Sequence, residues 1–170
     1  MNGSFRRTIA TALRPHSLTI LLFISVPACA AFAAPPPPSN YCKGIHFLWQ
    51  HIYNPQRMEL QKRCVTVTGV IVNTRREPDG DLHLRLKLDS QFVSMLNDGN
   101  TSNQSRDLVV EPICDHTGTQ TDAIGACKTF QSTIPHYRAG TRVMVTGSYV
   151  RDHEHGWMEI HPVTRITQTQ

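Results

Sequence analysis

The sequence lacks the short motifs that identify several enzyme classes. It contains no nucleophile elbow, no P-loop and no zinc-protease motif. Its histidines also lack the placed serine and aspartate partners that a catalytic triad requires. We therefore expect a protein that is not an enzyme and whose function is binding.

The sequence also has little excess charge once its N-terminal segment is set aside. The whole chain carries 17 Lys and Arg against 13 Asp and Glu, but Arg6, Arg7 and Arg14 lie near the N-terminus. The remainder has 14 basic and 13 acidic residues. Proteins that neutralise phosphates need clustered positive charge, so nucleic acid is not an expected partner.

Residues 1–33 have the three parts of a secretory signal peptide. A basic stretch without acids precedes an apolar segment, and Ala31-Phe32-Ala33 supplies the small residues of a cleavage site. We predict cleavage after Ala33, a secreted or periplasmic protein, and no membrane span in the remainder. Two alternatives stay open: an uncleaved anchor over 17–34, and a lipoprotein in which Cys29 is the lipidated residue.

Cysteine usage agrees with export. Four cysteines follow the leader, and none forms the short Cys-x-x-Cys spacing of structural zinc sites. An even number in a short exported chain indicates two disulfides, for which three connectivities are possible. We predict the pairs Cys42–Cys64 and Cys114–Cys127, because each closes a short loop and should stabilise the fold by roughly 3 kcal/mol.

The remaining chain is predicted to form a linker followed by one domain. A run of four prolines predicts a stiff linker over 34–40, and the domain covers 41–170. Apolar residues at i, i+3, i+4 and i+7 predict a helix over 45–52, with Trp49 in the core. A second helix is expected over 122–131.

Five segments are predicted to be β-strands. The clearest is 81–89, where four leucines alternate with His83, Arg85 and Lys87. We expect the leucines to face the core and the basic residues to face outward. A polar loop is expected over 97–105. The predicted strands are 64–74, 81–89, 107–114, 141–150 and 157–166.

A nine-residue pattern occurs twice, at Cys64–Val72 and at Arg142–Val150, with five identical positions. Each copy places a glycine, Gly69 or Gly147, in mid-strand, which is typical of a bulge or a tight bend. The order β-β-β-α-β-β is that of the OB-fold, so we predict a mainly β fold, a five-stranded Greek-key barrel in which the two copies are neighbours. A Greek-key sandwich is the alternative.

Several motifs carry a resemblance to a family. The chain from 64 to 166 resembles an uncharacterised family of exported bacterial and archaeal OB-fold-type domains. The resemblance implies the fold and brings no assigned activity. The motifs that carry it are Val67–Gly69, Asp79–Asp89, Leu108–Glu111, Val145–Tyr149 and His155–Pro162.

Two loops, 75–81 and 151–156, should meet at the end of the barrel where OB-folds bind ligands. The favoured interpretation is that both are ordinary polar hairpins. The alternative is a divalent metal site, because imidazole and carboxylate together bind zinc, copper, nickel or manganese. Apart from such a metal, no cofactor is expected. The residues of that site would be Asp79, Asp81, His153 and His155.

Strand 157–166 has two distinct faces. If Met158 and Ile160 fill the core, then Trp157, Glu159 and His161 lie on the outer side. The favoured interpretation is that the N-terminal helix covers this face and Trp157 packs beneath it. The alternative is a ligand platform that offers stacking and hydrogen bonds to a sugar or a base.

The third candidate surface is His83, Arg85 and Lys87 on the second strand. These residues could bind an anion, but nucleic-acid-binding OB-folds add aromatic residues to such a face, and the second and third strands have none. A solvated charged face is the favoured interpretation.

The function predicted from the sequence is non-catalytic binding of a small ligand, a metal ion or an envelope component by an exported module. One alternative is a metal-dependent hydrolase, since Asp79-Gly-Asp81 before a leucine-rich strand resembles thermonuclease-like OB enzymes. Another is a structural protein-interaction module. The oligomeric state does not follow from the sequence.

Overall fold

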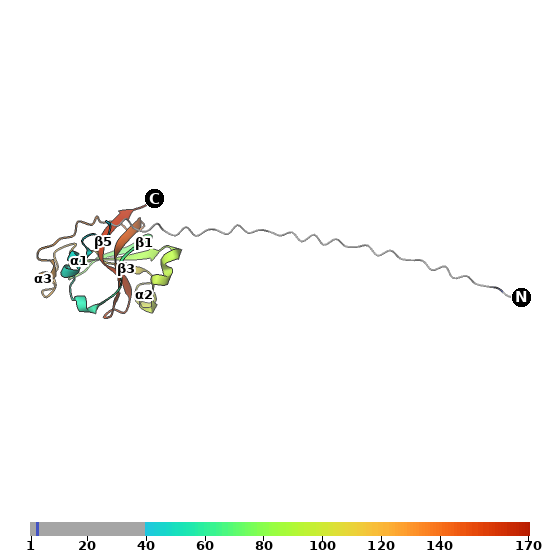
Figure 1. The fold of residues 1–170 in the computed structure, drawn as a ribbon, viewed down its shortest axis with the longest axis horizontal. Coiled ribbons are helices and arrows are strands. Elements are labelled where there is room, and N and C mark those ends of the chain that lie inside the picture. Colours follow the sequence, from blue (N-terminus) through green and yellow to red (C-terminus); the bar gives the residue numbers. More distant parts are fainter. Residues whose placement is uncertain (1–2, 4–39) are drawn as a thin grey trace. The chain divides into compact units, whose positions relative to one another are not determined.

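The structure is a computed structural model that describes Gly3 and residues 40–170 (Figure 1). The predicted signal peptide, Cys29 and the linker up to residue 39 lie outside the described residues. Residues 40–170 are mainly β, with few and short helices. Within the described residues, no helix is both long enough and apolar enough to cross a membrane.

Five strands form one sheet that closes on itself in the order β1-β2-β3-β5-β4. All neighbouring pairs are antiparallel except β3 and β5, which run parallel. The five predicted strands are present, although β3 keeps only three residues of the predicted 107–114. Pro112 follows β3 and cannot donate to a ladder. The strands are β1 Met58–Arg76, β2 Leu82–Leu88, β3 Leu108–Val110, β4 Arg142–Asp152 and β5 Met158–Gln168.

The helices are shorter than the sequence pattern indicates. The predicted helix over 45–52 appears as α1, Ile45–Leu48, continued by a 3-10 turn, and Trp49 packs against a buried apolar cluster. The helix predicted over 122–131 is a single turn, α3 Ile124–Cys127. Further 3-10 turns are η2 Pro55–Arg57 and η3 Ser90–Met95.

The prediction of a loop over 97–105 was wrong, because α2, Asp98–Asn103, lies there. Asn97 and Asn100 cap this helix reciprocally, each side chain accepting from the other's backbone N–H. Asn100 is buried, and its side-chain amide donates to the carbonyls of Asp107 and Met158. Polar residues that usually mark a loop here build a helix held to β3 and β5.

The two copies of the nine-residue pattern pair with each other, as predicted. Val67 lies opposite Val145, the equivalent position of the other copy, so the two segments are related by a local two-fold arrangement. Thr66 and Thr146 lie opposite each other, and their hydroxyl groups form a 2.7 Å hydrogen bond. Each pattern therefore supplies one half of the β1–β4 ladder.

The two mid-strand glycines allow neighbouring strands to approach closely. A Cβ atom at Gly69 would collide with the backbone oxygen of Lys87, and one at Gly147 with that of Pro162. The register of β4 against β5 also shifts at Gly147, which is the predicted bulge. These glycines are required by the closure of the sheet.

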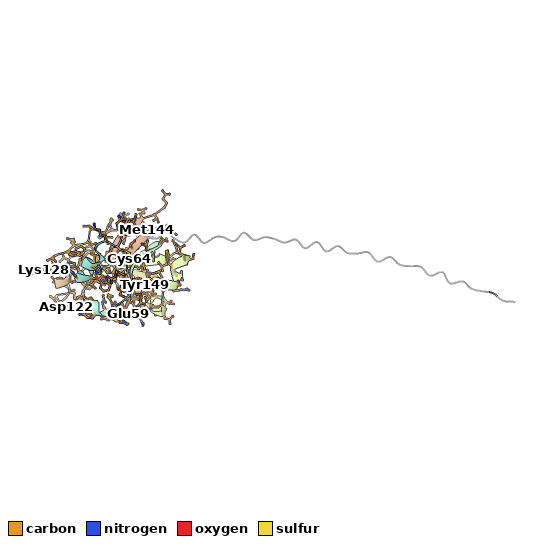
Figure 2. All side chains as sticks on the ribbon, in the orientation of Figure 1. Glu59, Cys64, Asp122, Lys128, Met144 and Tyr149 are labelled. Atoms are coloured by element: carbon orange, nitrogen blue, oxygen red, sulfur yellow. A yellow bond between two sulfur atoms is a disulfide. The ribbon has the colours of Figure 1, made fainter. Side chains whose placement is uncertain are left out.

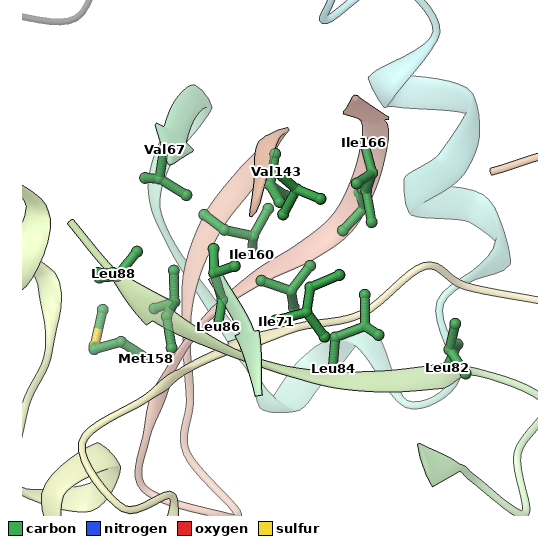
Figure 3. Close-up of a cluster of buried hydrophobic side chains, with 14 residues drawn as sticks. Val67, Ile71, Leu82, Leu84, Leu86, Leu88, Val143, Met158, Ile160 and Ile166 are labelled. Carbon is green, nitrogen blue, oxygen red and sulfur yellow. The ribbon is translucent and has the colours of Figure 1, made fainter. Parts of the chain in front are cut away.

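Apolar side chains fill the interior of the ring, where Val67, Leu86, Val143 and Ile160 point toward one another from four strands (Figure 3). The four leucines of β2 belong to this core, as the alternation predicts. A second apolar cluster forms outside the ring and includes Ile52, Ile113 and Val150.

Both predicted disulfides are present. Cys42 is bonded to Cys64 and Cys114 to Cys127, with Cα atoms 6.0 and 5.3 Å apart. The first joins the start of the domain to β1, on which Cys64 is labelled in Figure 2. The second fastens α3 to the segment after β3, in contact with the second apolar cluster.

Candidate functional site

A set of ionisable side chains lies on the outer side of β2, β3 and β5. The alternation that sends Leu84 and Ile160 into the core sends His83 and Glu159 the other way. Glu111 follows β3, and its N–H donates to the carbonyl of Ile160. The outer side of the ring therefore gathers His83, Glu111, Glu159 and His161.

These four residues are buried, which corrects the expectation of a solvated basic face at His83. His83 is 4% exposed and His161 is 0% exposed. Of the other two residues of that surface, Lys87 is exposed and Arg85 is half-buried, with a hydrogen bond to Ser105. The alternation predicted which way His83 points but not that other segments cover it.

Gln104, which follows α2, contacts Nε2 of His83 at 3.4 Å, and two further segments border the charged side chains. The segment after β3 is anchored by the backbone N–H of Leu82, which donates to Pro112, and places Ile113 against Val150 of β4. The N-terminal segment contributes Ile52 to the same cluster. Val150 pairs with Glu159, so the cluster borders the charged side chains directly.

A continuous hydrogen-bond chain links the buried groups. The indole N–H of Trp157 donates to Glu159 at 2.9 Å, and the other Glu159 oxygen lies 3.0 Å from Nδ1 of His161. The same Nδ1 lies 3.0 Å from Glu111 Oε2, and Glu111 Oε1 lies 2.8 Å from Nδ1 of His83. The predicted outer face of Trp157, Glu159 and His161 is thus one connected network.

Asp81 completes the cluster from the loop before β2. Its Oδ1 accepts a 2.7 Å hydrogen bond from the backbone N–H of Cys114. Its Oδ2 lies 3.8 Å from Nε2 of His161, too far for a hydrogen bond. Within the described residues, that nitrogen is buried and has no hydrogen-bond partner.

Burial and mutual contact shift the pKa values of these groups in opposite directions. Burial raises the pKa of Asp81 to about 8, although the charge of His161 opposes the shift. Burial also acts to raise the pKa of Glu111, but hydrogen bonds from His161 and His83 outweigh it and hold that pKa well below its ordinary range. Asp81 therefore keeps its proton near neutral pH, whereas Glu111 is ionised.

The imidazole groups respond to the carboxylates around them. Burial acts to lower the pKa of His161, but its contacts with Glu111 and Glu159 raise it well above the ordinary value. The pKa of His83 is raised in the same way by Glu111 against the effect of burial. Burial and the Glu111 charge raise the pKa of Glu159. The cluster is held together by charge and shared protons.

Among the residues that the structure describes, two groups of side chains have the spacing of metal ligands. Asp81, Glu111 and His161 each offer one atom within 4.8 Å of the others. The second group joins Asp81 to Cys114 and Cys127, but the sulfurs are bonded to each other and supply no thiolate. Only the first group therefore offers three available donors.

A pocket of about 270 Å³ opens beside the cluster, between the β1–β2 loop and the β4–β5 loop. The sequence predicts that these loops meet at one end, and residues of both line this pocket. Glu111 and His83 belong to its wall, so the pocket reaches the buried network. Its other lining residues are Tyr53, Asn54, Arg57, Arg75, Glu77, Pro78, Asp79, Gln120, Glu154, His155 and Trp157.

Trp157 forms an aromatic wall of the pocket, and no residue of α1 lines that pocket. Its ring stacks on that of His155 with centroids 4.5 Å apart and planes 7° from parallel. His155 is held by Asp152 through a 2.8 Å contact, and Arg57 lies 3.1 Å from the same carboxylate. The indole is thereby fixed in orientation at the mouth of the network.

The structure separates the four residues of the loop metal hypothesis. Asp79 and His155 line the pocket, while Asp81 lies deeper, against His161. His153 forms an exposed ion pair with Glu59 at 3.0 Å. The four do not form one group with metal-ligand spacing among the described residues.

Sequence reasoning did not select Glu111 or Arg57 as site residues. Glu111 does carry a signal, because it is a carboxylate placed directly after the aliphatic run Leu108–Val110. Arg57 carries none, since its role depends on Asp152, which lies far away in the sequence.

Comparison with known proteins does not identify a relative. No protein-family model matches the sequence, and no curated protein is significantly similar to it. The function is therefore inferred from the geometry and chemistry of the site.

Proposed function

We propose that this chain is an exported, non-catalytic binding module built on an OB-type barrel, and that it binds a small organic cation. The observation that carries the proposal is the pocket between the β1–β2 and β4–β5 loops, with its aromatic wall and its excess of carboxylates. The strand order and the parallel β3–β5 pair support the OB-type assignment. The two disulfides are consistent with export.

The charge of the pocket favours a cation. Its lining includes four carboxylates and two guanidinium groups. Both guanidinium groups already have carboxylate partners, since Arg57 pairs with Asp152 and Arg75 with Glu77. Asp79 forms no ion pair within the described residues and accepts only the backbone N–H of Asp81. An ammonium group would therefore find an uncompensated carboxylate.

The aromatic wall favours an organic ligand. Trp157 stacks on His155 and lines the pocket, and the face of an indole ring attracts cations. An ammonium group with attached carbon atoms can contact both the ring and the carboxylate of Asp79. A volume of about 270 Å³ suits a molecule of a few carbon atoms.

Calorimetric titration with putrescine tests the proposal, with 1,4-butanediol as the uncharged analogue. We expect saturable binding of putrescine only, and at least about tenfold weaker binding by Asp79→Asn, because a charged hydrogen bond contributes 1.5–3 kcal/mol. Asp81→Asn is the matched control: it makes the same substitution two residues away, at a residue that does not line the pocket, and should bind putrescine normally. Equal binding of the diol, or an unaffected Asp79→Asn variant, would refute the proposal.

A further inference from the structure

Nε2 of His161 is one of four buried side-chain atoms without a hydrogen-bond partner among the described residues. His161 itself is fully buried. Buried polar atoms are almost always paired, because an unmade hydrogen bond in the interior is costly. This nitrogen points toward a carboxylate oxygen of Asp81 that lies 3.8 Å away. A bound group that contacts both atoms would remove the free-energy cost of the unmade hydrogen bond.

The separation of these atoms is slightly longer than that of two ligands on one metal ion. A tetrahedral ion with bonds of 2.0–2.2 Å holds its ligands roughly 3.3–3.6 Å apart. Glu111 supplies a third donor, with one atom of each residue within 4.8 Å of the other two. A contraction of a few tenths of an ångström would bring Asp81 and His161 to ligand distance.

The residues around the three donors orient them as the outer shell of a metal site does. Nδ1 of His161 lies 3.0 Å from Glu159 and 3.0 Å from Glu111, so the ring presents Nε2 to Asp81. For Glu111 to bind the same ion, one of its oxygens must turn away from Nδ1. Metal-binding histidines usually hold a carboxylate or carbonyl through their second nitrogen in this way. Oδ1 of Asp81 is held by the Cys114 backbone N–H, which leaves Oδ2 directed at His161.

The buried carboxylates around His161 also favour a bound cation. Asp81, Glu111 and Glu159 are all buried around His161. Carboxylate and imidazole donors gathered in this way can bind a divalent ion directly.

We propose that Asp81, Glu111 and His161 bind a divalent transition-metal ion, with Zn²⁺ as the best match, beneath the wall of the pocket. One imidazole and two carboxylates are donors that zinc accepts, whereas Mg²⁺ and Ca²⁺ prefer oxygen alone. Glu111 lines the pocket and thus connects it to the ion. This site goes beyond the proposed pocket ligand and uses other residues than Asp79 and Trp157.

The test is a calorimetric titration of the oxidised, chelator-treated protein with ZnCl₂, with MgCl₂ as the comparison ion. We expect one saturable zinc site, with magnesium at least about a hundredfold weaker. Asp81→Asn should weaken zinc binding at least about tenfold, while its amide oxygen can still accept from Cys114. Asp79→Asn makes the same substitution two residues away, at a carboxylate outside the group of three donors, and should change the zinc affinity less than about threefold.

Two further variants make the result specific. His153→Ala should bind zinc normally, since that exposed histidine represents adventitious surface binding. Glu159→Gln should weaken zinc binding by about tenfold through the orientation of His161. With Co²⁺ in place of zinc, the visible absorption of a four- or five-coordinate ion should appear in the wild-type protein and be lost in Asp81→Asn.

Several outcomes would overturn the proposal. These are no saturable zinc binding, equal binding of magnesium, or equal loss of affinity in Asp79→Asn and Asp81→Asn. If Asp81→Asn does not fold by circular dichroism, Glu111→Gln is measured against the same criteria. Because putrescine binding depends on Asp79 and zinc binding on Asp81, failure of the pocket proposal and failure of the metal proposal are distinguishable.

Discussion

Ile160 and His161 are neighbours on β5, and both are fully buried, yet they lie in two different kinds of interior. Ile160 points into the ring, where every neighbour in the cluster is apolar. His161 points out of the ring into a layer of carboxylates that other segments cover. The first interior excludes water and needs no partner atoms. The second is stable only while each charged group keeps its partners.

The largest difference between the two interiors should follow from removing His161. His161→Ala leaves Glu111 and Glu159 buried without their shared cation, and breaking a buried pair in this way costs about 3–5 kcal/mol. Urea unfolding of the metal-free protein measures the loss. His153→Ala, at an exposed position, should change stability by no more than about 0.5 kcal/mol. Similar losses in both variants would mean that His161 does not organise the outer layer.

Loosening the segment after β3 should cause the next largest loss of stability. The Cys114–Cys127 disulfide fastens the segment that lies over the outer layer, and the two cysteines are 13 residues apart. Replacing both with alanine should reduce stability by about 3 kcal/mol, the contribution of a loop of this size in the chain-entropy model. Amide hydrogen exchange should rise first in the segment 112–131. A uniform rise over all strands would show that this disulfide does not act through the cover.

The apolar interior should tolerate a small deletion. Ile160→Val removes one methylene group from a packed core and should cost about 0.5–1.5 kcal/mol in urea unfolding. The loss should be the same at all pH values between 5 and 8, because no charged group faces this side chain. A loss that changes strongly with pH would mean that the two interiors are coupled through β5.

The smallest loss of stability is expected from breaking an ion pair that lies at the surface. Arg142 lies 2.8 Å from Asp89, and although burial acts to raise the pKa of Asp89, hydrogen bonds from Thr68 and Arg142 lower it. A lowered pKa stabilises the fold above the ordinary value near 4 and loses that contribution as the pH falls further. Arg142→Leu should therefore cost less than about 1 kcal/mol at pH 7 and still less at pH 3. A stability difference between the wild type and Arg142→Leu that grows as the pH falls would contradict this prediction.

Some of the site could be predicted from the sequence. The alternation along 157–166 placed Trp157, Glu159 and His161 on one face, and the loop positions predicted where the pocket lies. The partners of these residues could not be predicted, because Asp81 and Glu111 reach His161 from segments that approach only in the closed sheet. The helix at Asn97 was missed because its capping asparagines resemble a turn signal.

By itself, the sequence determined the five strands, the pairing of the repeated segments and the two disulfides. Alternating side chains and short loops are local properties, so the strands and disulfides could be inferred from them, whereas the pairing of the repeated segments followed from the order of the elements. Only the tertiary structure decided that the outer side of β2, β3 and β5 is buried. Alternation tells which way a side chain points, but solvation depends on what lies over it, and here Gln104 and Glu111 reach His83 from other segments.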